Sequence, residues 1–308
     1  MKKEISLVTG GCGFIGSHLC NKLISIGHKV VVIDNLSTGK KNNQIYHKNI
    51  HYINGDINNH ECVKKVFSDY ELTYVFHLAA VVGVKLTIEK PLLVLEDLKG
   101  IDLLYKFSAQ SKIKKFYFAS SSEVYGEPFS IPQNELTTPL NSRLPYAIVK
   151  NAGEAYSIAY KDEYGLESTN LRFFNTYGPM QRSDFVVSIF INAAIANKPL
   201  EVYGDGLQTR TFCYVTDTVN CIAELINLKK NVNSINIGSE HQININQLAK
   251  EIISLTNSKS EIKYLPPLEK GDMTRRQPCN KLLNSIMGNY KFITFVMNRW
   301  KNFVYHNS

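Results

Sequence analysis

The stretch that most restricts the fold is VTGGCGFIGSHL, residues 8–19, where a short apolar run leads through a glycine-rich turn into a helical pattern. Glycines at such a turn allow a tight bend, let the backbone approach a pyrophosphate, and permit close packing of helix on strand. The start of the following helix faces the phosphates with its free N–H groups. The pattern predicts a dinucleotide site that contains Gly10, Gly13, Phe14, Ile15 and Gly16.

Short apolar runs alternate with helical patterns over the first half of the chain. The runs are ISLVTG, KVVVID, HYINGDI, YVFHLAA and KKFYFASS. Such alternation is typical of βαβ units and a parallel sheet. A long helical pattern runs from Pro145 to Gly165, and beyond residue 178 loops and prolines become more frequent. We therefore expect an α/β protein with a dinucleotide-binding domain over residues 1–178 and a smaller α/β lobe, interleaved with it, over residues 179–308.

Acidic residues follow the second and third predicted strands. Asp34 stands eighteen positions after Gly16, where a carboxylate would accept the adenosine ribose hydroxyls. Its charge would repel a 2′-phosphate, which favours NAD over NADP. Asp56, in NGDI, is placed to meet the adenine edge, with an ordinary turn aspartate as the alternative. Asn35 and Ile57 are assigned to the same cofactor site.

Composition excludes several classes of protein. With 308 residues, 44% of them hydrophobic, the chain can bury a substantial core. Its six cysteines form no CxxC pair, which favours reduced thiols in a cytoplasmic protein and predicts no metal site. No apolar run is long enough to cross a bilayer, so no membrane insertion is expected. The net charge of +8 is spread in ones and twos, which predicts no nucleic-acid partner but suits an anionic small substrate.

A possible catalytic pair lies in PYAIVK, where Tyr146 and Lys150 are four residues apart and so share one face of a helix. A phenol is a poor base near pH 7, but a neighbouring ammonium group stabilises the phenolate. A tyrosine and a lysine at this spacing also occur together by chance, so a plain surface pair is the alternative. The dinucleotide turn and the serine-ended strand that precede the pair favour catalysis.

Eight motifs in the expected order together resemble the extended short-chain dehydrogenase/reductase family, in its nucleotide-sugar epimerase, dehydratase and decarboxylase branch. They are TGGCGFIG, DNLSTG, GDI, HLAA, SSSEVYG, YAIVK, RFFNTYGP and VYGDGLQTRTFCYVTD, and they cover roughly residues 5–220. The resemblance implies a Rossmann-type doubly wound parallel sheet with a smaller C-terminal substrate lobe. It also implies tightly held NAD, a nucleotide-sugar substrate and a homodimer.

The resemblance also assigns roles to single residues. Tyr146 would deprotonate a sugar hydroxyl, Lys150 would bind the nicotinamide ribose and lower the tyrosine pKa, and Ser121 would be the catalytic hydroxyl. Ser120 and Ser122 are expected to satisfy backbone groups at the strand end. Leu78, Ala79 and Ala80 would line the cofactor. The expected contacts to the nucleotide sugar are Asn175, Val202, Tyr203, Arg210 and Arg276, with plain surface charge as the alternative for each arginine.

Three stretches depart from the family pattern, one of them Pro278-Cys279, where members tend to have Pro-Asp. Members usually have an Asn followed by Val-x-Gly in the helix after HLAA, whereas this chain reads LEDLKG, one residue short and without the Asn. The C-terminal stretch MGNYKFITFVMNRW replaces the usual Gly-Trp-x-Pro segment. The helical apolar spacing of FITFVMNRWKNFVYH, residues 292–306, predicts a terminal helix that covers its own lobe, with a partner-binding helix as the alternative.

Glu123 separates the possible reactions. Members of this branch first oxidise the hexose at C4, after which the ketone is re-reduced from the other face, loses water across C5 and C6, or loses CO2 from a uronate. A 4-epimerase needs no acid beside the serine, whereas dehydratases and uronate decarboxylases have a glutamate there. We therefore expect a 4,6-dehydratase or a uronate decarboxylase. The alternatives are a UDP-hexose 4-epimerase in which Glu123 only supports the backbone, a ketoreductase that uses free NADPH, and a non-catalytic NAD-binding regulator.

Overall fold

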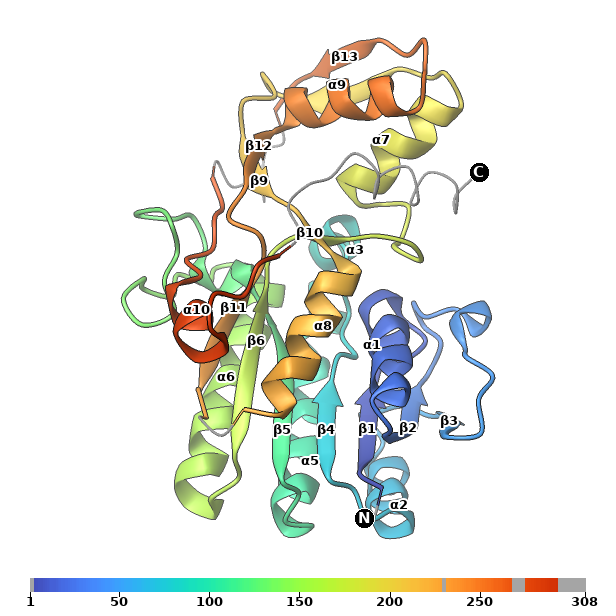
Figure 1. The fold of residues 1–308 in the computed structure, drawn as a ribbon, viewed down its shortest axis with the longest axis vertical. Coiled ribbons are helices and arrows are strands. Elements are labelled where there is room, and N and C mark those ends of the chain that lie inside the picture. Colours follow the sequence, from blue (N-terminus) through green and yellow to red (C-terminus); the bar gives the residue numbers. More distant parts are fainter. Residues whose placement is uncertain (1–2, 229–230, 268–274, 293–308) are drawn as a thin grey trace. The chain divides into compact units, whose positions relative to one another are not determined.

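The computed structural model describes residues 3–228, 231–267 and 275–292, which divide between two compact units (Figure 1). The first unit takes the described parts of Met1–Val124, Leu140–Phe173 and Val219–Ile235. The second takes those of Tyr125–Pro139, Phe174–Thr218 and Asn236–Ser308. The chain therefore passes repeatedly between the units, and the division at Phe173 lies slightly before the expected boundary at residue 178. Residues 293–308, which include most of the expected terminal helix, lie outside the described residues.

A seven-stranded sheet with the order β11-β6-β5-β4-β1-β2-β3 forms the centre of the first unit. Its strands are β1 (Ile5–Thr9), β2 (Lys29–Asp34), β3 (Ile50–Asn54), β4 (Tyr74–His77), β5 (Lys115–Ser121), β6 (Ser168–Phe173) and β11 (Ser234–Ile237). All neighbouring pairs from β3 to β6 run parallel. The order reverses between β1 and β4, and ligands of doubly wound sheets bind at that point, beyond the carboxyl ends of the strands. The expected doubly wound fold is confirmed.

Helices cover both faces of this sheet (Figure 1). They are α1 (Phe14–Ser25), α2 (His60–Asp69), α3 (Val84–Glu89), α4 (Pro91–Leu95), α5 (Asp97–Gln110), α6 (Pro145–Tyr164) and α8 (Val215–Ile226), with short 3-10 turns η1 (Lys41–Asn43) and η2 (Ser122–Tyr125). Side chains of β1, β2, β4 and β5 pack with α2, α5 and α6 in one core cluster. On α8, the Leu225 carbonyl accepts a hydrogen bond from the Tyr117 hydroxyl of β5, at 3.3 Å. Strands buried on both faces explain the almost continuous apolar runs in the sequence.

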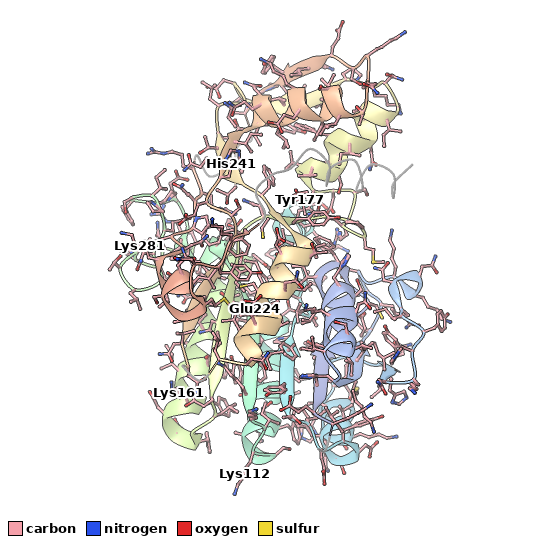
Figure 2. The ribbon with its side chains drawn as sticks, viewed as in Figure 1. Lys112, Lys161, Tyr177, Glu224, His241 and Lys281 are labelled. Carbon is pink, nitrogen blue, oxygen red and sulfur yellow. The ribbon has the colours of Figure 1, made fainter. Side chains whose placement is uncertain are left out.

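The long helix α6 begins and ends where the sequence predicts. Pro145 occupies its first turn, where the missing N–H costs no hydrogen bond, and Gly165 ends it in the left-handed conformation with φ +68°. Near its end, Lys161 (labelled in Figure 2) donates to the Asn233 side chain at 3.1 Å. Asn233 also accepts from the backbone of Asn170 in β6, which is why residues 219–235 belong with the first unit.

Over its described residues, the second unit packs three helices with three pairs of strands. The elements are β7 (Thr176–Tyr177), α7 (Val186–Ile195), β8 (Leu200–Tyr203), β9 (Thr209–Thr211), β10 (Cys213–Tyr214), β12 (Gln242–Asn244), α9 (Ile245–Leu255), β13 (Ile262–Leu265) and α10 (Lys281–Met287). The pairs are β7 with β10, β8 with β13, and β9 with β12. Tyr177, labelled in Figure 2, lies in the core that α7, β8 and α9 share. Asn244 and Gln247 form a capping box that fixes the start of α9.

A buried ion pair joins the helix and strands at one side of the first unit. Arg172 of β6 donates to both carboxylate oxygens of Glu154 on α6, at 2.9 and 2.6 Å, and both side chains are 5% exposed. The Ser120 hydroxyl of β5 donates to the same carboxylate at 2.5 Å. Such a pair offsets its desolvation cost through hydrogen bonds of this kind, and removing one partner leaves an uncompensated charge.

Arg172→Ala is expected to lower the free energy of unfolding by about 3–5 kcal/mol, because it strands the buried Glu154 carboxylate. Arg182→Ala is the matched control, since Arg182 also makes two hydrogen bonds to one carboxylate, that of Asp184, but near the surface. Its expected cost is about 0–1 kcal/mol. Urea unfolding followed by circular dichroism measures both values. Equal costs for the two variants would contradict this account of α6.

Candidate functional site

The glycine-rich turn between β1 and α1 has the geometry of a phosphate cradle. Gly10 has φ +71°, and a Cβ placed on it would lie 2.8 Å from the backbone nitrogen of Ala79. A Cβ on Gly16 would collide with the Gly10 carbonyl oxygen. The helix α1 starts after Gly13, with no side chain capping its first N–H groups. Open N–H groups beside a turn in which Gly10, Gly11 and Gly13 carry no side chain fit the pyrophosphate of a dinucleotide.

Asp34 is fixed beside this turn at the carboxyl end of β2. Its two carboxylate oxygens accept hydrogen bonds from the backbone N–H groups of Cys12 and Leu36, each at 2.8 Å. The carboxylate is therefore held by the glycine turn on one side and by its own loop on the other. The neighbouring Asn35 donates to Asp56, which follows β3, at 3.3 Å. The structure thus brings Asp34, Asn35 and Asp56 to one end of the sheet, as the sequence predicts, while Ile57 is buried.

The segment Leu78–Ala80 after β4 lies against the end of β1. Leu78 donates to the Thr9 carbonyl, and Ala79 donates to the Thr9 hydroxyl, both at 3.2 Å. The His77 ring nitrogen Nδ1 pairs with the same hydroxyl at 2.7 Å. Burial, together with the charge of Lys150, lowers the pKa of His77 to about 3. This imidazole is therefore neutral at physiological pH and serves to hold the segment in place.

The three serines at the end of β5 are not equivalent. Ser120 donates to the buried Glu154 carboxylate, so its hydroxyl is part of the ion pair described above. The Ser121 hydroxyl accepts a hydrogen bond from the backbone N–H of Glu123 at 3.2 Å. Ser122 is buried, whereas Glu123 is half-buried. Ser120 therefore binds a buried carboxylate, whereas the sequence predicts that it satisfies backbone groups at the strand end. Glu123 is the more accessible polar side chain of this segment.

Tyr146 and Lys150 lie on α6 with the lysine on the buried side. The Lys150 Nζ is 5.6 Å from the centroid of the Tyr146 ring and 5.1 Å from that of Phe118 in β5. Burial lowers the pKa of Lys150 to about 8, while the negative charge of Asp97 opposes that shift. The lysine therefore remains mostly an ammonium group at pH 7, close enough to the tyrosine ring to stabilise a phenolate.

Within the second unit, the expected nucleotide-sugar residues lie around β9. Asn175, with φ +33°, donates through its amide to the Thr211 carbonyl at 3.0 Å. Arg210 lies in β9 itself and donates to the Thr209 carbonyl at 2.9 Å. Thr209 in turn forms a β-bridge with Arg275, next to Arg276. The structure thus connects Asn175, Arg210 and the 275–276 segment, which are far apart in sequence.

Among the expected substrate residues, Val202 and Arg276 are buried, whereas Tyr203 is exposed. Val202 is fully buried in the core of the second unit, so its side chain supports β8 and cannot touch a ligand directly, contrary to expectation. Tyr203, the next residue, is 41% exposed and open to stacking. Arg276 is 7% exposed, which makes a plain surface charge the wrong interpretation of this residue.

The sequence interpretation missed Asp97, Glu154 and Arg172. Glu154 follows Lys150 by four residues on the same helix face, and Arg172 is a charged residue in an otherwise apolar buried strand. Both patterns signal a buried partner. The stretch LEDLKG lacks the expected asparagine, but its Asp97 begins α5. The Asp97 carboxylate accepts a hydrogen bond from the backbone N–H of Val81 at 2.8 Å.

The described residues, 3–228, 231–267 and 275–292, contain neither a metal cluster nor a membrane-spanning helix. Those ranges bring together no group of three or more His, Cys, Asp or Glu side chains suited to a metal ion. They also include no helix with the length and apolar character needed to cross a membrane.

Residues 6–238 match the model of the NAD-dependent epimerase/dehydratase family. The chain is 39% identical to a UDP-N-acetyl-alpha-D-glucosaminuronate decarboxylase of Bacillus cytotoxicus, over 86% of this chain and 84% of that protein. It is 32% identical to the UDP-glucose 4-epimerase of Thermotoga maritima, solved with UDP-glucose, with a TM-score of 0.93 over 98% of each chain. The Thermus thermophilus UDP-glucose 4-epimerase, solved with NAD, is 29% identical with a TM-score of 0.89 over 98% of each chain.

Gly10→Ala is expected to weaken NAD binding at least about tenfold and to destabilise the fold, because its Cβ meets the Ala79 backbone that lines the turn. Gly165→Ala is the matched control, since Gly165 has a similar φ of +68° but no atom within 4 Å of a Cβ. Holding an alanine in the left-handed conformation should lower the free energy of unfolding by only about 1–2 kcal/mol. The affinity for NAD should stay unchanged. Fluorescence titration with NAD and thermal unfolding measure these effects. Unchanged NAD affinity in Gly10→Ala would contradict the cradle.

Proposed function

The chain belongs to the NAD-dependent epimerase/dehydratase family, and on that basis we propose that it oxidises a UDP-sugar at C4 and then acts at C5 and C6. The favoured reaction is decarboxylation of a UDP-uronate, with 4,6-dehydration as the related outcome. The observation that carries this proposal is the half-buried carboxylate of Glu123, directly after the buried serines at the end of β5. The similarity to a uronate decarboxylase supports the same choice.

Tyr146 is the proposed base for the first step. As the phenolate, its oxygen takes the proton of the C4 hydroxyl while the C4 hydrogen leaves as hydride. Bound NAD supplies the reversible hydride acceptor. Lys150, held as an ammonium group beside the Tyr146 ring, favours the phenolate, and Ser121 offers a hydroxyl to the C4 oxygen. The turn around Gly10 and Gly16 would hold the pyrophosphate, and Asp34 the adenosine ribose.

Glu123 is the proposed acid–base group of the second step. In a uronate, oxidation at C4 places the C6 carboxylate β to a ketone. The C5–C6 bond then breaks, CO2 leaves, and the bonding electrons form an enolate between C4 and C5. C5 must afterwards gain a proton, and the C4 ketone must regain hydride. A carboxyl group near C5 can deliver that proton, a contribution typically worth a factor of about 100 to 10,000 in rate.

The second unit is proposed to bind the nucleoside diphosphate. Arg210 and Arg276 carry planar guanidinium groups that can donate two parallel hydrogen bonds to a phosphate. Asn175 is held in the same connected segment, and the exposed Tyr203 can stack on the base. Calorimetric titration of Arg210→Ala with UDP tests this assignment, because a residue outside the phosphate site would leave the affinity unchanged.

A 4-epimerase is the second candidate. It is supported by the similarity to the Thermotoga maritima enzyme over nearly the whole of both chains. In that reaction the C4 ketone is re-reduced from its other face, and no bond at C5 or C6 changes. Glu123 would then support the strand end without touching the reacting atoms.

A cytoplasmic homodimer is the proposed state of the protein. No disulfide joins the six cysteines, all of which lie within the described residues, as is typical of a reducing compartment. The helices α4 and α6 expose large apolar side chains, Leu92, Ile148 and Ile158 among them. Burying them against a second copy would remove an apolar surface from water. Sedimentation equilibrium should give twice the chain mass, and a monomer mass at micromolar concentration would contradict the dimer.

Glu123→Gln is expected to abolish net turnover while NADH still accumulates when substrate is added, because C4 oxidation needs Tyr146 and the later step needs Glu123. Tyr146→Phe should show neither NADH nor product. Glu127→Gln, at an exposed glutamate four residues further on, is the matched control and should turn over normally. Absorbance at the NADH band and NMR of the products measure both steps. Normal turnover in Glu123→Gln would contradict the proposed role.

A further inference from the structure

The tyrosine of the motif SSSEVYG, Tyr125, has no part in either proposed step, yet it is completely buried. It is the last residue of η2, the turn that also carries Glu123. Its hydroxyl donates a hydrogen bond to the side-chain oxygen of Asn236 in β11 at 2.8 Å. A buried hydroxyl normally has such a partner, and this partner is 111 positions away in the chain. The end of the turn is therefore fixed to β11.

Asn236 holds more than this turn. It is completely buried in β11, between two buried isoleucines. Its side-chain nitrogen donates to the Gln133 carbonyl at 2.9 Å, and its backbone N–H donates to the Glu135 carboxylate at 2.8 Å. An asparagine side chain provides both an acceptor and a donor, which an ionised aspartate or a leucine does not. Both ends of the amide are therefore used, one for Tyr125 and the other for the loop that follows it.

The same loop holds the segment that carries Arg276. The backbone N–H of Gln133 donates to the Gln277 carbonyl at 2.7 Å, and the Gln133 carbonyl accepts from the backbone N–H of Cys279 at 2.8 Å. Together these two bonds make a parallel β-bridge. The Gln133 carbonyl thus receives hydrogen bonds from both Asn236 and the segment of Arg276. A single buried peptide group therefore joins that segment to β11.

We propose that Asn236 is a positioning residue: it ties the end of the turn that carries Glu123 and the segment that carries Arg276 to one strand. The bonded residues, Tyr125, Gln133, Asn236, Gln277 and Cys279, all belong to the second unit and are called the Asn236 frame. Asn236 has no exposed surface, so it acts through its partners and not on the substrate. This inference rests on the proposed function, which gives Glu123 and Arg276 their roles.

Tyr125→Phe removes the bond to the turn and keeps the aromatic ring. With UDP-glucuronate, CO2 release should slow about tenfold or more while NADH accumulates, because Glu123 is no longer held in place and C4 oxidation continues. The affinity for UDP should stay unchanged, since the segment of Arg276 keeps its bonds. Tyr117→Phe is the matched control, because Tyr117 is also completely buried and also loses one hydroxyl bond, to the Leu225 carbonyl. It should change neither quantity.

Asn236→Ala removes both side-chain bonds. Calorimetric titration should then show UDP binding at least about tenfold weaker, because the segment of Arg276 is no longer held ready for the phosphates. Peptides that contain the backbone N–H groups of Gln133 and Cys279 should also exchange hydrogen with D2O faster, as mass spectrometry measures, because their bridge opens more often. Asn170→Ala is the matched control, since Asn170 is a buried strand asparagine of β6 outside the Asn236 frame. It should leave both measurements unchanged.

Two results would overturn the proposal. One is CO2 release at the normal rate in Tyr125→Phe, and the other is UDP binding in Asn236→Ala within about twofold of the unmodified protein. If Asn236→Ala does not fold, Tyr125→Phe decides alone, because it removes one oxygen atom and leaves the ring in the core.

Hydrogen exchange separates this inference from the proposed function, because it requires no substrate. Faster exchange at Gln133 and Cys279 in Asn236→Ala supports the frame even if no UDP-sugar reduces bound NAD. Failure of every sugar would overturn the function and leave the frame intact. Unchanged exchange at both N–H groups would overturn the frame, whichever reaction the protein performs. Accumulation of NADH in Tyr125→Phe with normal UDP affinity is an effect that a merely structural tyrosine would not have.

Discussion

A buried ion pair between Glu154 and Arg172 holds the helix of Tyr146 and Lys150 against the strands that end at the candidate site. It joins α6 to β6 directly and to β5 through Ser120, so three elements meet at one carboxylate. A charge pair at this depth gains little net stability compared with apolar side chains of similar volume. The pair instead fixes how α6 is aligned with β5 and β6, because the planar guanidinium group can make both hydrogen bonds in only one arrangement.

Packing reinforces this alignment close to the catalytic pair. Gly153 on α6 has no room for a side chain because the Phe118 ring of β5 lies directly against it. The same ring lies beneath the Lys150 ammonium group. The lysine therefore lies in an apolar environment, and burial lowers its pKa to about 8. Stability and the proposed chemistry thus depend on the same few contacts between β5 and α6.

Much of the first unit could be predicted from the sequence, because its signals are local. The glycine turn, the position of Asp34 after β2, and the proline and glycine that bound α6 all lie within one βα unit or one helix. Partners distant in the chain could not be predicted. The pairing of Ser120 with Glu154, and of Asp97 with Val81, depends on how strands and helices stack, which no short pattern records. The burial of Val202 could not be predicted for the same reason, since the alternating pattern along β8 does not show which face of the strand packs against the core.

The sequence predicts two units, the second of them interleaved with the first. The loops after residue 178 indicate a smaller lobe, but the return of residues 219–235 to the first unit follows from hydrogen bonds to β5 and β6. The roles of Ser121, Glu123 and Tyr146 stay predictions, supported by the geometry of the strand end and of α6. Among them Glu123 decides between the two classes of reaction.

The most direct test of that decision is the hydrogen at C5 of the product. The protein would be incubated in D2O with UDP-glucuronate and, separately, with its 2-acetamido analogue, and the products followed by NMR. Action of Glu123 at C5 and C6 predicts release of CO2 and one deuterium at C5, because that carbon is protonated from a group that exchanges with solvent. A C4 epimer of the substrate that carries no deuterium at C5 would contradict the account.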